Sequence, residues 1–270
     1  MIEKLIKYWG IMRVSIRERL QFRFDFAMSL FAAAMFAGLY YLLWRAIYAY
    51  TPHPVMPWAQ LITYTMAGQA INFARFSPAE RTPVYRMTYQ IREGDIALEL
   101  IKPVGFMMRR FLEAIGFFLV ELLWVNLPLL ALGMLLFEVK APASLTVGLG
   151  FLVSLIIAFI IAFALNSIVM VLAFWTTNTF GTQMAKRALV EIASGMLIPF
   201  EFFPEWLRVI VNHLPFKGMA YIPLSIYTGK IHGMAIVFSI GEQLLWATAI
   251  LAVSQCLWWV ASRRVTIFGG

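Results

Sequence analysis

The chain has 270 residues, of which 61% are hydrophobic and 13% are charged, with a net charge of +8. A soluble domain is about half apolar and about a quarter charged, so this composition excludes an ordinary water-soluble fold. At about 20 apolar residues per span, the length accommodates six membrane spans and leaves no room for a large soluble domain. In so apolar a chain the positive charge indicates loops held at the cytoplasmic membrane face rather than nucleic-acid binding.

Residues 1–22 predict an amphipathic helix. Apolar residues recur mostly every three or four positions, and Lys4, Lys7, Arg13 and Arg17 lie on the opposite face. A basic face opposite an apolar one is typical of a helix that lies in the headgroup plane of a membrane. We therefore interpret this segment as an interfacial helix; the alternative is a short helix packed on other loops.

The apolar stretches that follow predict an all-α polytopic membrane protein with six transmembrane helices in one domain, residues 1–270. The predicted spans are residues 26–48, 58–79, 111–137, 145–175, 188–203 and 234–261. A helix needs about 20 residues to cross about 30 Å of hydrocarbon, and most of these stretches reach that length. The fifth is short because Pro199 and Pro204 are expected to end it.

The second predicted span is more polar than the first. Thr65, Gln69 and Asn72 are spaced four and three residues apart, so they share one face of the helix. Lipid cannot satisfy such groups, and the face is therefore expected to point at protein or water.

Residues 85–104 are too polar to cross a membrane and connect the second span to the third. Asp95 suits a helix N-cap, residues 96–102 predict a short helix, and Pro103 is expected to stop it. A short capped helix that exposes Ile and Leu fits a groove on another protein. A solvated loop helix explains the same pattern equally well.

Residues 199–230 form a second segment that is not expected to span. The apolar stretch between Pro204 and Pro215 is too short to cross the hydrocarbon as a helix, at about 1.5 Å per residue. It therefore predicts short re-entrant or interfacial helices on the outer side.

The basic residues are unevenly distributed between the two sides of this topology. With both termini in the cytoplasm, the outer side keeps only these of the 22 Lys and Arg residues: Arg45, Lys140, Arg208, Lys217 and Lys230. Cytoplasmic loops carry an excess of Lys and Arg. The distribution thus predicts that both termini and residues 85–104 face the cytoplasm.

The sequence contains no pattern that would carry catalysis. The Gly229-Lys230 pair lacks the upstream glycine and the following Ser or Thr of a phosphate-binding loop. His53, His213 and His232 are scattered and lack the spacing of a metal site. We therefore expect no enzyme activity, no metal site and no cofactor in this chain.

Three acidic residues within or beside the predicted spans need an explanation, because a charge at the centre of a span costs a few kcal/mol. They are Glu121, Glu191 and Glu242. One interpretation is pairing inside the chain, for example Glu121 with Asn166, or Glu191 with Lys186 or Arg187. The other is a polar spot in a transport path, which an ion-coupled secondary transporter or a channel would need. A membrane enzyme or an assembly scaffold is a third hypothesis, weakened by the missing catalytic cluster.

Together these elements resemble the permeases of the type-2 ABC exporter family along the whole chain. The stretches that carry the resemblance are RFDFAMSL at 23–30, LWR at 43–45, REGDIALELIKPVG at 92–105 and IPFEFFPEWLRVIVNHLPF at 198–216. The ending RRVTIFGG at 263–270 is similar to an uncharacterised bacterial branch of that family.

The resemblance implies a permease that exports an amphipathic or hydrophobic molecule, such as a drug or a lipid, across the bacterial cytoplasmic (inner) membrane. It implies pairing with the same or a similar permease, docking on two ABC ATPase subunits that hold ATP and Mg²⁺, and no nucleic-acid partner.

The resemblance also implies three groups of functional residues. The coupling segment that contacts the ATPase would comprise Arg92, Glu93, Gly94, Asp95, Ile96, Leu98, Glu99, Leu100 and Pro103. The substrate path would include Thr65, Gln69, Asn72, Glu121 and Glu191. The outer gate would include Pro199, Phe203, Pro204, Trp206 and Pro215.

Overall fold

The structure, a computed structural model, describes residues 2–21, 23–52, 54–79, 90, 96–176 and 180–263. The regular elements in these residues are all helical. The α-helices are α1 Ile2–Gln21, α2 Arg23–Ala49, α3 Trp58–Ala79, α5 Ile96–Leu100, α6 Phe106–Glu121, α7 Leu127–Leu136, α8 Leu145–Leu172, α9 Phe180–Ala193, α10 Glu205–Asn212, α11 Tyr221–Tyr227 and α12 Met234–Ser262. The shorter elements are the π-helical turn η2 Leu122–Asn126 and the 3₁₀ turns η3 Phe200–Phe202 and η4 Pro215–Met219.

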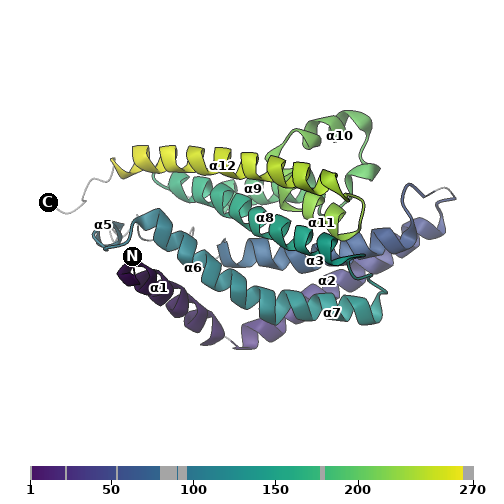
Figure 1. The fold of residues 1–270 in the computed structure, drawn as a ribbon, viewed down its shortest axis with the longest axis horizontal. Coiled ribbons are helices and arrows are strands. Elements are labelled where there is room, and N and C mark those ends of the chain that lie inside the picture. The colour runs from purple at the N-terminus through teal and green to yellow at the C-terminus, as the bar shows by residue number, and fades with distance from the viewer. Residues whose placement is uncertain are drawn as a thin grey trace.

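The long helices form one elongated bundle (Figure 1). The start of α1, the end of α12 and the short helix α5 lie at one end of it, and the connections α2–α3 and α7–α8 lie at the other (Figure 1). Helix α3 is in the middle and contacts α2, α6, α7, α8 and α11. The bundle therefore has two distinct ends, and α5 shares one of them with the first and last described helices.

Among the described residues, four stretches are long and apolar enough to cross a membrane: Phe26–Ala49, Phe106–Leu136, Leu145–Leu172 and Met234–Ser262. Helix α3 has 22 residues, but its apolar character is interrupted by Thr63, Thr65 and Gln69. Helix α9 has 14 residues, or about 21 Å, which is short of about 30 Å of hydrocarbon. The structure thus supports four spans by length and composition, and six spans remain a prediction.

The fifth predicted span, 188–203, differs from the helix that forms. Helix α9 occupies Phe180–Ala193 and ends before either proline. Gly195 follows it with φ +73°, a left-handed conformation that commonly closes a helix C-terminus and that glycine adopts without strain. A Cβ at this position would lie 2.7 Å from the Phe200 ring, so the site also lacks space for a side chain. Gly195, rather than Pro199, is therefore the residue that terminates the helix.

The third predicted span, 111–137, begins five residues too late, because α6 starts at Phe106. The helix continues to Leu136 through η2, where the Leu127 N–H donates to the Leu122 carbonyl five residues earlier. Pro128 comes next; it has no N–H, and its ring cannot sit in a regular α-helical ladder. The wider π turn accommodates it without ending the helix. The 31 residues span about 46 Å, so part of α6 extends beyond the hydrocarbon.

Helix α1 packs along α6. The contact is close at Gly116, where a Cβ would lie 3.0 Å from both the Met12 carbonyl oxygen and the Ser15 Cβ. At the far end of α1, the Arg19 Nε donates to the buried Glu121 carboxylate over 3.0 Å. A glycine contact and a buried ion pair thus fix α1 against α6. This packing is consistent with an amphipathic α1. The position of α1 at the membrane interface stays a prediction.

We expect the substitution Gly116→Leu to lower the free energy of unfolding by about 1–3 kcal/mol, because the added side chain forces α1 away from α6. Gly241→Leu is the control: it lies in α12, with nothing within 4 Å of its added Cβ, and it gains the same helix propensity. Denaturant unfolding of the purified protein in detergent measures the difference. Equal effects of the two substitutions would contradict a close α1–α6 contact.

Candidate functional site

Helix α5 is held at its end of the bundle by one buried apolar side chain. Ile96 is buried in a cluster with Phe106 and Met107 of α6 and Val169 and Met170 of α8. An aromatic stack covers the cluster: the ring of Phe106 lies 4.6 Å from that of Trp258 on α12, at an interplanar angle of 15°. Three long helices therefore converge on the first residue of α5.

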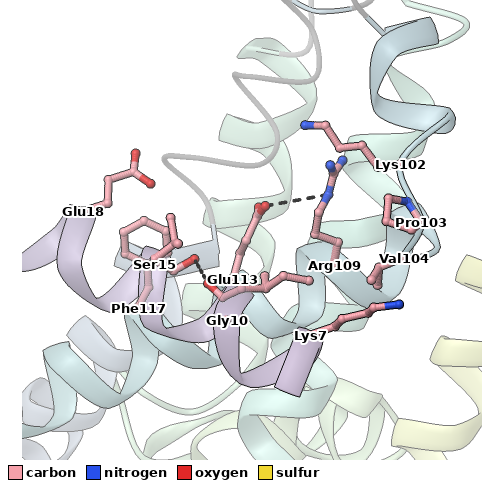
Figure 2. A pocket seen from close by; sticks show the side chains of 12 residues that line it. Lys7, Gly10, Ser15, Glu18, Lys102, Pro103, Val104, Arg109, Glu113 and Phe117 are labelled. Carbon is pink, nitrogen blue, oxygen red and sulfur yellow. Dashed lines mark hydrogen bonds and ion pairs between the residues drawn. The ribbon is translucent and has the colours of Figure 1, made fainter. Parts of the chain in front are cut away.

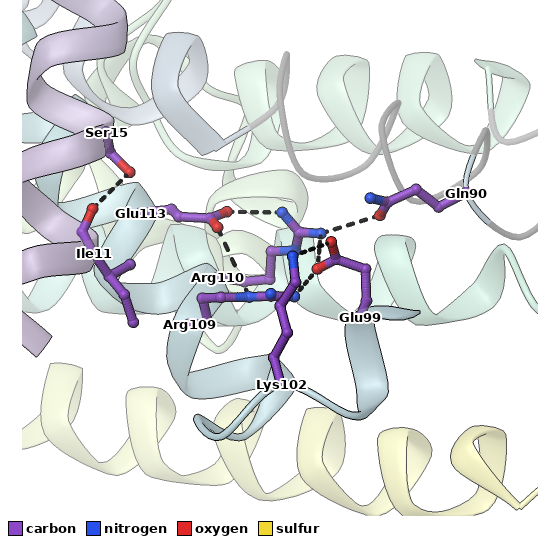
Figure 3. A network of polar contacts seen from close by, with 8 residues as sticks. All are labelled: Ile11, Ser15, Gln90, Glu99, Lys102, Arg109, Arg110 and Glu113. Carbon is purple, nitrogen blue, oxygen red and sulfur yellow. Dashed lines mark hydrogen bonds and ion pairs between the residues drawn. The ribbon is translucent and has the colours of Figure 1, made fainter. Parts of the chain in front are cut away.

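Charged side chains provide the second attachment of α5 (Figure 3). Glu99 forms ion pairs with Arg109 and, at 3.4 Å, with Arg110, both on the first turn of α6. Arg110 also pairs with Glu113 at 2.8 Å, and its Nη2 donates to the Gln90 side-chain oxygen over 3.1 Å. Arg110 is only 1% exposed, so its buried charge would be strongly destabilising without these partners. The network thus fixes α5 relative to α6 (Figure 3).

The outer surface of α5 and of the turn after it is apolar. Leu98 is 60% exposed and Ile101 is 80% exposed, and Leu100 and Pro103 are also at the surface. The residues predicted as one coupling segment therefore divide into two sets: Ile96 and Glu99 point inward, whereas the leucines point outward. Arg92, Glu93, Gly94 and Asp95, also named in that prediction, lie outside the described residues.

Sequence reasoning missed the inward partners of this site. Arg109 and Arg110 were counted only as charges of a cytoplasmic loop, because the third span was expected to begin at residue 111. The available signal was the spacing to Glu113, which follows by four and three residues and so shares a helical face with them. Ile101 was placed inside the predicted helix 96–102, but α5 ends at Leu100.

Removing the Glu99 carboxylate should destabilise the protein. We expect Glu99→Gln to lower the free energy of unfolding by about 3 kcal/mol, because it leaves two buried guanidinium groups with one carboxylate fewer. The control is Glu205→Gln, which removes an exposed carboxylate 3.3 Å from Arg208 and should cost less than about 0.5 kcal/mol. Urea or guanidinium unfolding followed by tryptophan fluorescence tests this, and no difference between the two variants would refute the buried network.

The polar face of α3 points into the chain. Thr65 and Gln69 are buried, and the Thr65 hydroxyl donates to the Leu61 carbonyl oxygen over 2.9 Å. This arrangement satisfies the hydroxyl within its own helix and keeps the face away from lipid, as the spacing predicted. The side chain of Asn72 lies outside the described residues.

The acidic residues have partners, but one predicted pair does not form. Glu121 is 0% exposed and pairs with Arg19, whose guanidinium also lies 4.8 Å above the Phe26 ring. Asn166 instead accepts a hydrogen bond from Lys186. The predicted Glu121–Asn166 pair is therefore wrong, because the packing of α1 on α6 brings an arginine to Glu121 that the span topology could not indicate.

The two other acids pair with basic residues. Glu191 pairs with Arg187 at 2.8 Å along the same helix, one of the two partners expected for it. Glu242 pairs with Lys217 of η4 at 2.6 Å. Neither carboxylate is left alone in the membrane-facing part of the chain.

The outer segment folds into short helices, with its prolines at their starts. Pro199 precedes η3, Pro204 precedes α10 and Pro215 begins η4. Phe203 packs against Phe200, with ring centroids 5.4 Å apart. Trp206 is exposed on α10, next to the exposed Val209 and Ile210. Helix α10 therefore presents an apolar surface; its re-entrant position and gating role remain predictions.

The part of the segment after α10 is buried. Residues Ile222–Tyr227 of α11 are all buried, and α11 packs against α8 and α3. The ring of Tyr221 stacks on Phe200 at 4.3 Å, which links α11 to η3. This helix had not been singled out in the sequence because its seven residues are too few to show a helical period.

The family model described as ABC-2 family transporter protein matches residues 34–269, from within α2 to the C-terminal part of the chain. The chain belongs to the ABC-2 transporter family. A search of curated proteins found no match.

Family membership gives the coarse identity of the helical bundle. The protein is a permease of an ABC transporter, a multi-pass membrane component that associates with an ABC ATPase. The type-2 permease resemblance seen in the sequence is confirmed. Helix α1 precedes the matched residues, so the permease match rests on the bundle from α2 onward.

Proposed function

We propose that this permease exports an amphipathic or hydrophobic molecule from the cytoplasm, driven by ATPase subunits that dock on α5. One observation carries the proposal: a short helix and the turn after it, at the end of the bundle, expose Leu98, Leu100 and Ile101 while the helix is fixed to three long helices. Exposed apolar residues on a rigid support are typical of a protein–protein contact.

The attachment of α5 explains how force would be transmitted. Glu99, Arg109 and Arg110 join α5 to the first turn of α6. Helix α6 continues through η2 into α7 and reaches the other end of the bundle (Figure 1). A displacement of α5 by the ATPases would therefore move the start of a helix that crosses the whole bundle. ATP and Mg²⁺ would be held by the ATPases.

The orientation of the protein in the membrane follows from the elements at the α5 end of the bundle. The charge distribution along the sequence favours a cytoplasmic location for the segment around α5 and for both termini. The start of α1 and the end of α12 lie at the α5 end, in agreement with that location (Figure 1). We infer a multi-pass protein of the bacterial inner membrane with this end in the cytoplasm.

The docking role of α5 is tested by Leu98→Asp. We expect this variant to co-purify with at least tenfold less ABC ATPase than the unsubstituted permease. A carboxylate at the centre of an apolar contact must lose its hydration without gaining a partner. The side chain is exposed, so the fold should be unaffected. The measurement is the ATPase-to-permease ratio after co-expression and affinity purification in detergent.

The control for this experiment is Val55→Asp. Val55 is also exposed and apolar, but it lies in the α2–α3 connection at the opposite end of the bundle. It should co-purify with as much ATPase as the unsubstituted permease. Full ATPase recovery with Leu98→Asp would refute α5 as the docking site.

We also propose that a second permease packs against α9. Its main packing partner among the described elements is η4, so much of its surface is left uncovered. Met184, Leu189 and Ile192 are exposed on it, next to the Arg187–Glu191 pair. A substrate path between two permeases would then run beside Glu191. The polar face of α3 is buried within one chain, so Thr65 and Gln69 would reach that path only after the helices move.

A cysteine at the proposed interface should crosslink two copies. In a Cys256→Ser background, which removes the single cysteine of the chain, we expect Ile192→Cys to give a disulfide-linked dimer on mild oxidation in membranes. Phe238→Cys is the control, because it places an exposed cysteine on α12. Non-reducing gels measure the dimer fraction; a dimer with Phe238→Cys and none with Ile192→Cys would place the interface elsewhere.

The ion-coupled alternative rested on the acids in the spans. Glu121 and Glu242 each have a basic partner inside the chain. Pairing inside the chain accounts for the presence of both acids without a transport role. Neither residue supports an ion relay, and family membership favours the ATP-driven function.

A further inference from the structure

A cavity of about 480 Å³ lies between α1, the α5–α6 turn and α6 (Figure 2). Its apolar lining includes Ile11 and Val14 of α1 and Phe117 of α6, and its basic lining is Lys7, Lys102 and Arg109. The exporter function described above makes no use of this cavity, and α1 lies outside the residues that the family model matches. Its chemistry therefore needs an explanation of its own.

The charges are segregated within the cavity. Lys7, Lys102 and Arg109 lie on the side of Pro103 and Val104, whereas Glu18 lies on the opposite side (Figure 2). The second lining carboxylate, Glu113, lies between them and pairs with Arg109. Lys102 and Arg109 belong to the network of Figure 3, whose charged members among the described residues are three cations and the carboxylates Glu99 and Glu113. The exposed Lys7 adds a further cation at this end of the cavity. One end of the cavity therefore favours an anion.

The cavity also lies beside a surface suited to lipid. Helix α1 exposes Leu5, Ile6 and Trp9 on the side away from α6. An exposed apolar face with an interfacial tryptophan and flanking basic residues is typical of a helix at the bilayer surface. Val14 lines the cavity and is 64% exposed, so the cavity opens to the surface of α1. A ligand would enter from the membrane interface.

We propose that this cavity binds an anionic phospholipid of the cytoplasmic leaflet. Its phosphate would lie among Lys7, Lys102 and Arg109, and the upper part of an acyl chain would lie along Ile11, Val14 and Phe117. Basic pockets at the cytoplasmic ends of membrane helices bind anionic headgroups in this way. The lipid would bridge α1 to the α5–α6 turn, because Arg109 contributes both to the cavity and to the attachment of α5.

The test uses the purified full chain in a mild detergent, with phosphatidylglycerol, phosphatidylcholine or inorganic phosphate as the probe. A ligand that binds the native state raises the melting temperature. We expect phosphatidylglycerol to raise it by several degrees and to be retained in native mass spectra, with little effect of phosphatidylcholine. Inorganic phosphate at the same concentration should have no effect, because it lacks the acyl contacts.

Two variants locate the effect. Lys7→Glu should weaken the apparent affinity for phosphatidylglycerol at least fivefold, because it places a carboxylate at the basic end. Gly10→Phe should do the same without a change of charge, since Gly10 lines the cavity and its Cβ position has open space within 4 Å. Lys4→Glu is the matched control: it is exposed on the same helix but does not line the cavity. It should leave the affinity unchanged.

Three results would overturn the proposal. Equal stabilisation by phosphatidylcholine would show that the charge is irrelevant, and an equal shift with inorganic phosphate would indicate a soluble anion instead of a lipid. Equal losses with Lys4→Glu and Lys7→Glu would indicate a diffuse surface attraction rather than a site. None of these measurements depends on transport or on the ATPase, so they stand apart from the tests of the exporter function.

Discussion

Two adjacent arginines at the start of α6 hold together the end of the bundle that carries α5. Arg109 and Arg110 are almost completely buried, and a buried guanidinium is tolerated only with carboxylates close by. Glu99 and Glu113 provide them, one from α5 and one from α6 itself. This requirement converts a short helix that would be unstable alone into a rigid part of the bundle. The exposed leucine side of α5 is held in place because Glu99, on its other side, pairs with these arginines.

Lipid offers no hydrogen bonds, so polar side chains between the helices gain stability by bonding to one another. Gln243 of α12 illustrates this: its Oε1 accepts from the Ser154 hydroxyl at 2.8 Å, and its Nε2 donates to the Gly218 carbonyl oxygen at 2.7 Å. The three residues join α12, α8 and η4. Lys217 and Glu242 add an ion pair across the same contact. Polar pairing thus joins the helices in the part of the bundle away from α5, as the arginine network does at the α5 end.

Helix α1 would connect these features to the membrane surface if it lies at the interface, as the sequence predicts. Its inner side rests on Gly116 and ends in the Arg19–Glu121 pair, and its outer side exposes apolar residues. Arg109 of α6 lines the cavity beside α1 and also pairs with Glu99 of α5, the proposed ATPase-docking helix. One residue therefore lies next to both α1 and α5. Membrane composition and ATPase docking would then both act on the contact between α1, α5 and the start of α6.

The sequence by itself determined the helical class, the lipid environment and the inward direction of the polar face of α3 at Thr65 and Gln69. These properties depend on composition and on local periodicity, which do not require knowledge of distant contacts. It also indicated the family, through the order of its elements. Helix ends were harder to predict: Gly195 ends α9 ahead of two prolines, and α6 begins before two charged residues that resemble a loop.

Only the tertiary structure decided which charges meet. Glu121 pairs with Arg19, 102 positions away, rather than with Asn166. Glu99 points inward and Leu98 outward although both lie on one short helix. The cavity beside α1 is formed by three segments that no local pattern connects. Ion pairs and cavities depend on how helices pack across long sequence separations, and that packing is set by close approaches such as Gly116 against α1, which a one-dimensional pattern does not encode.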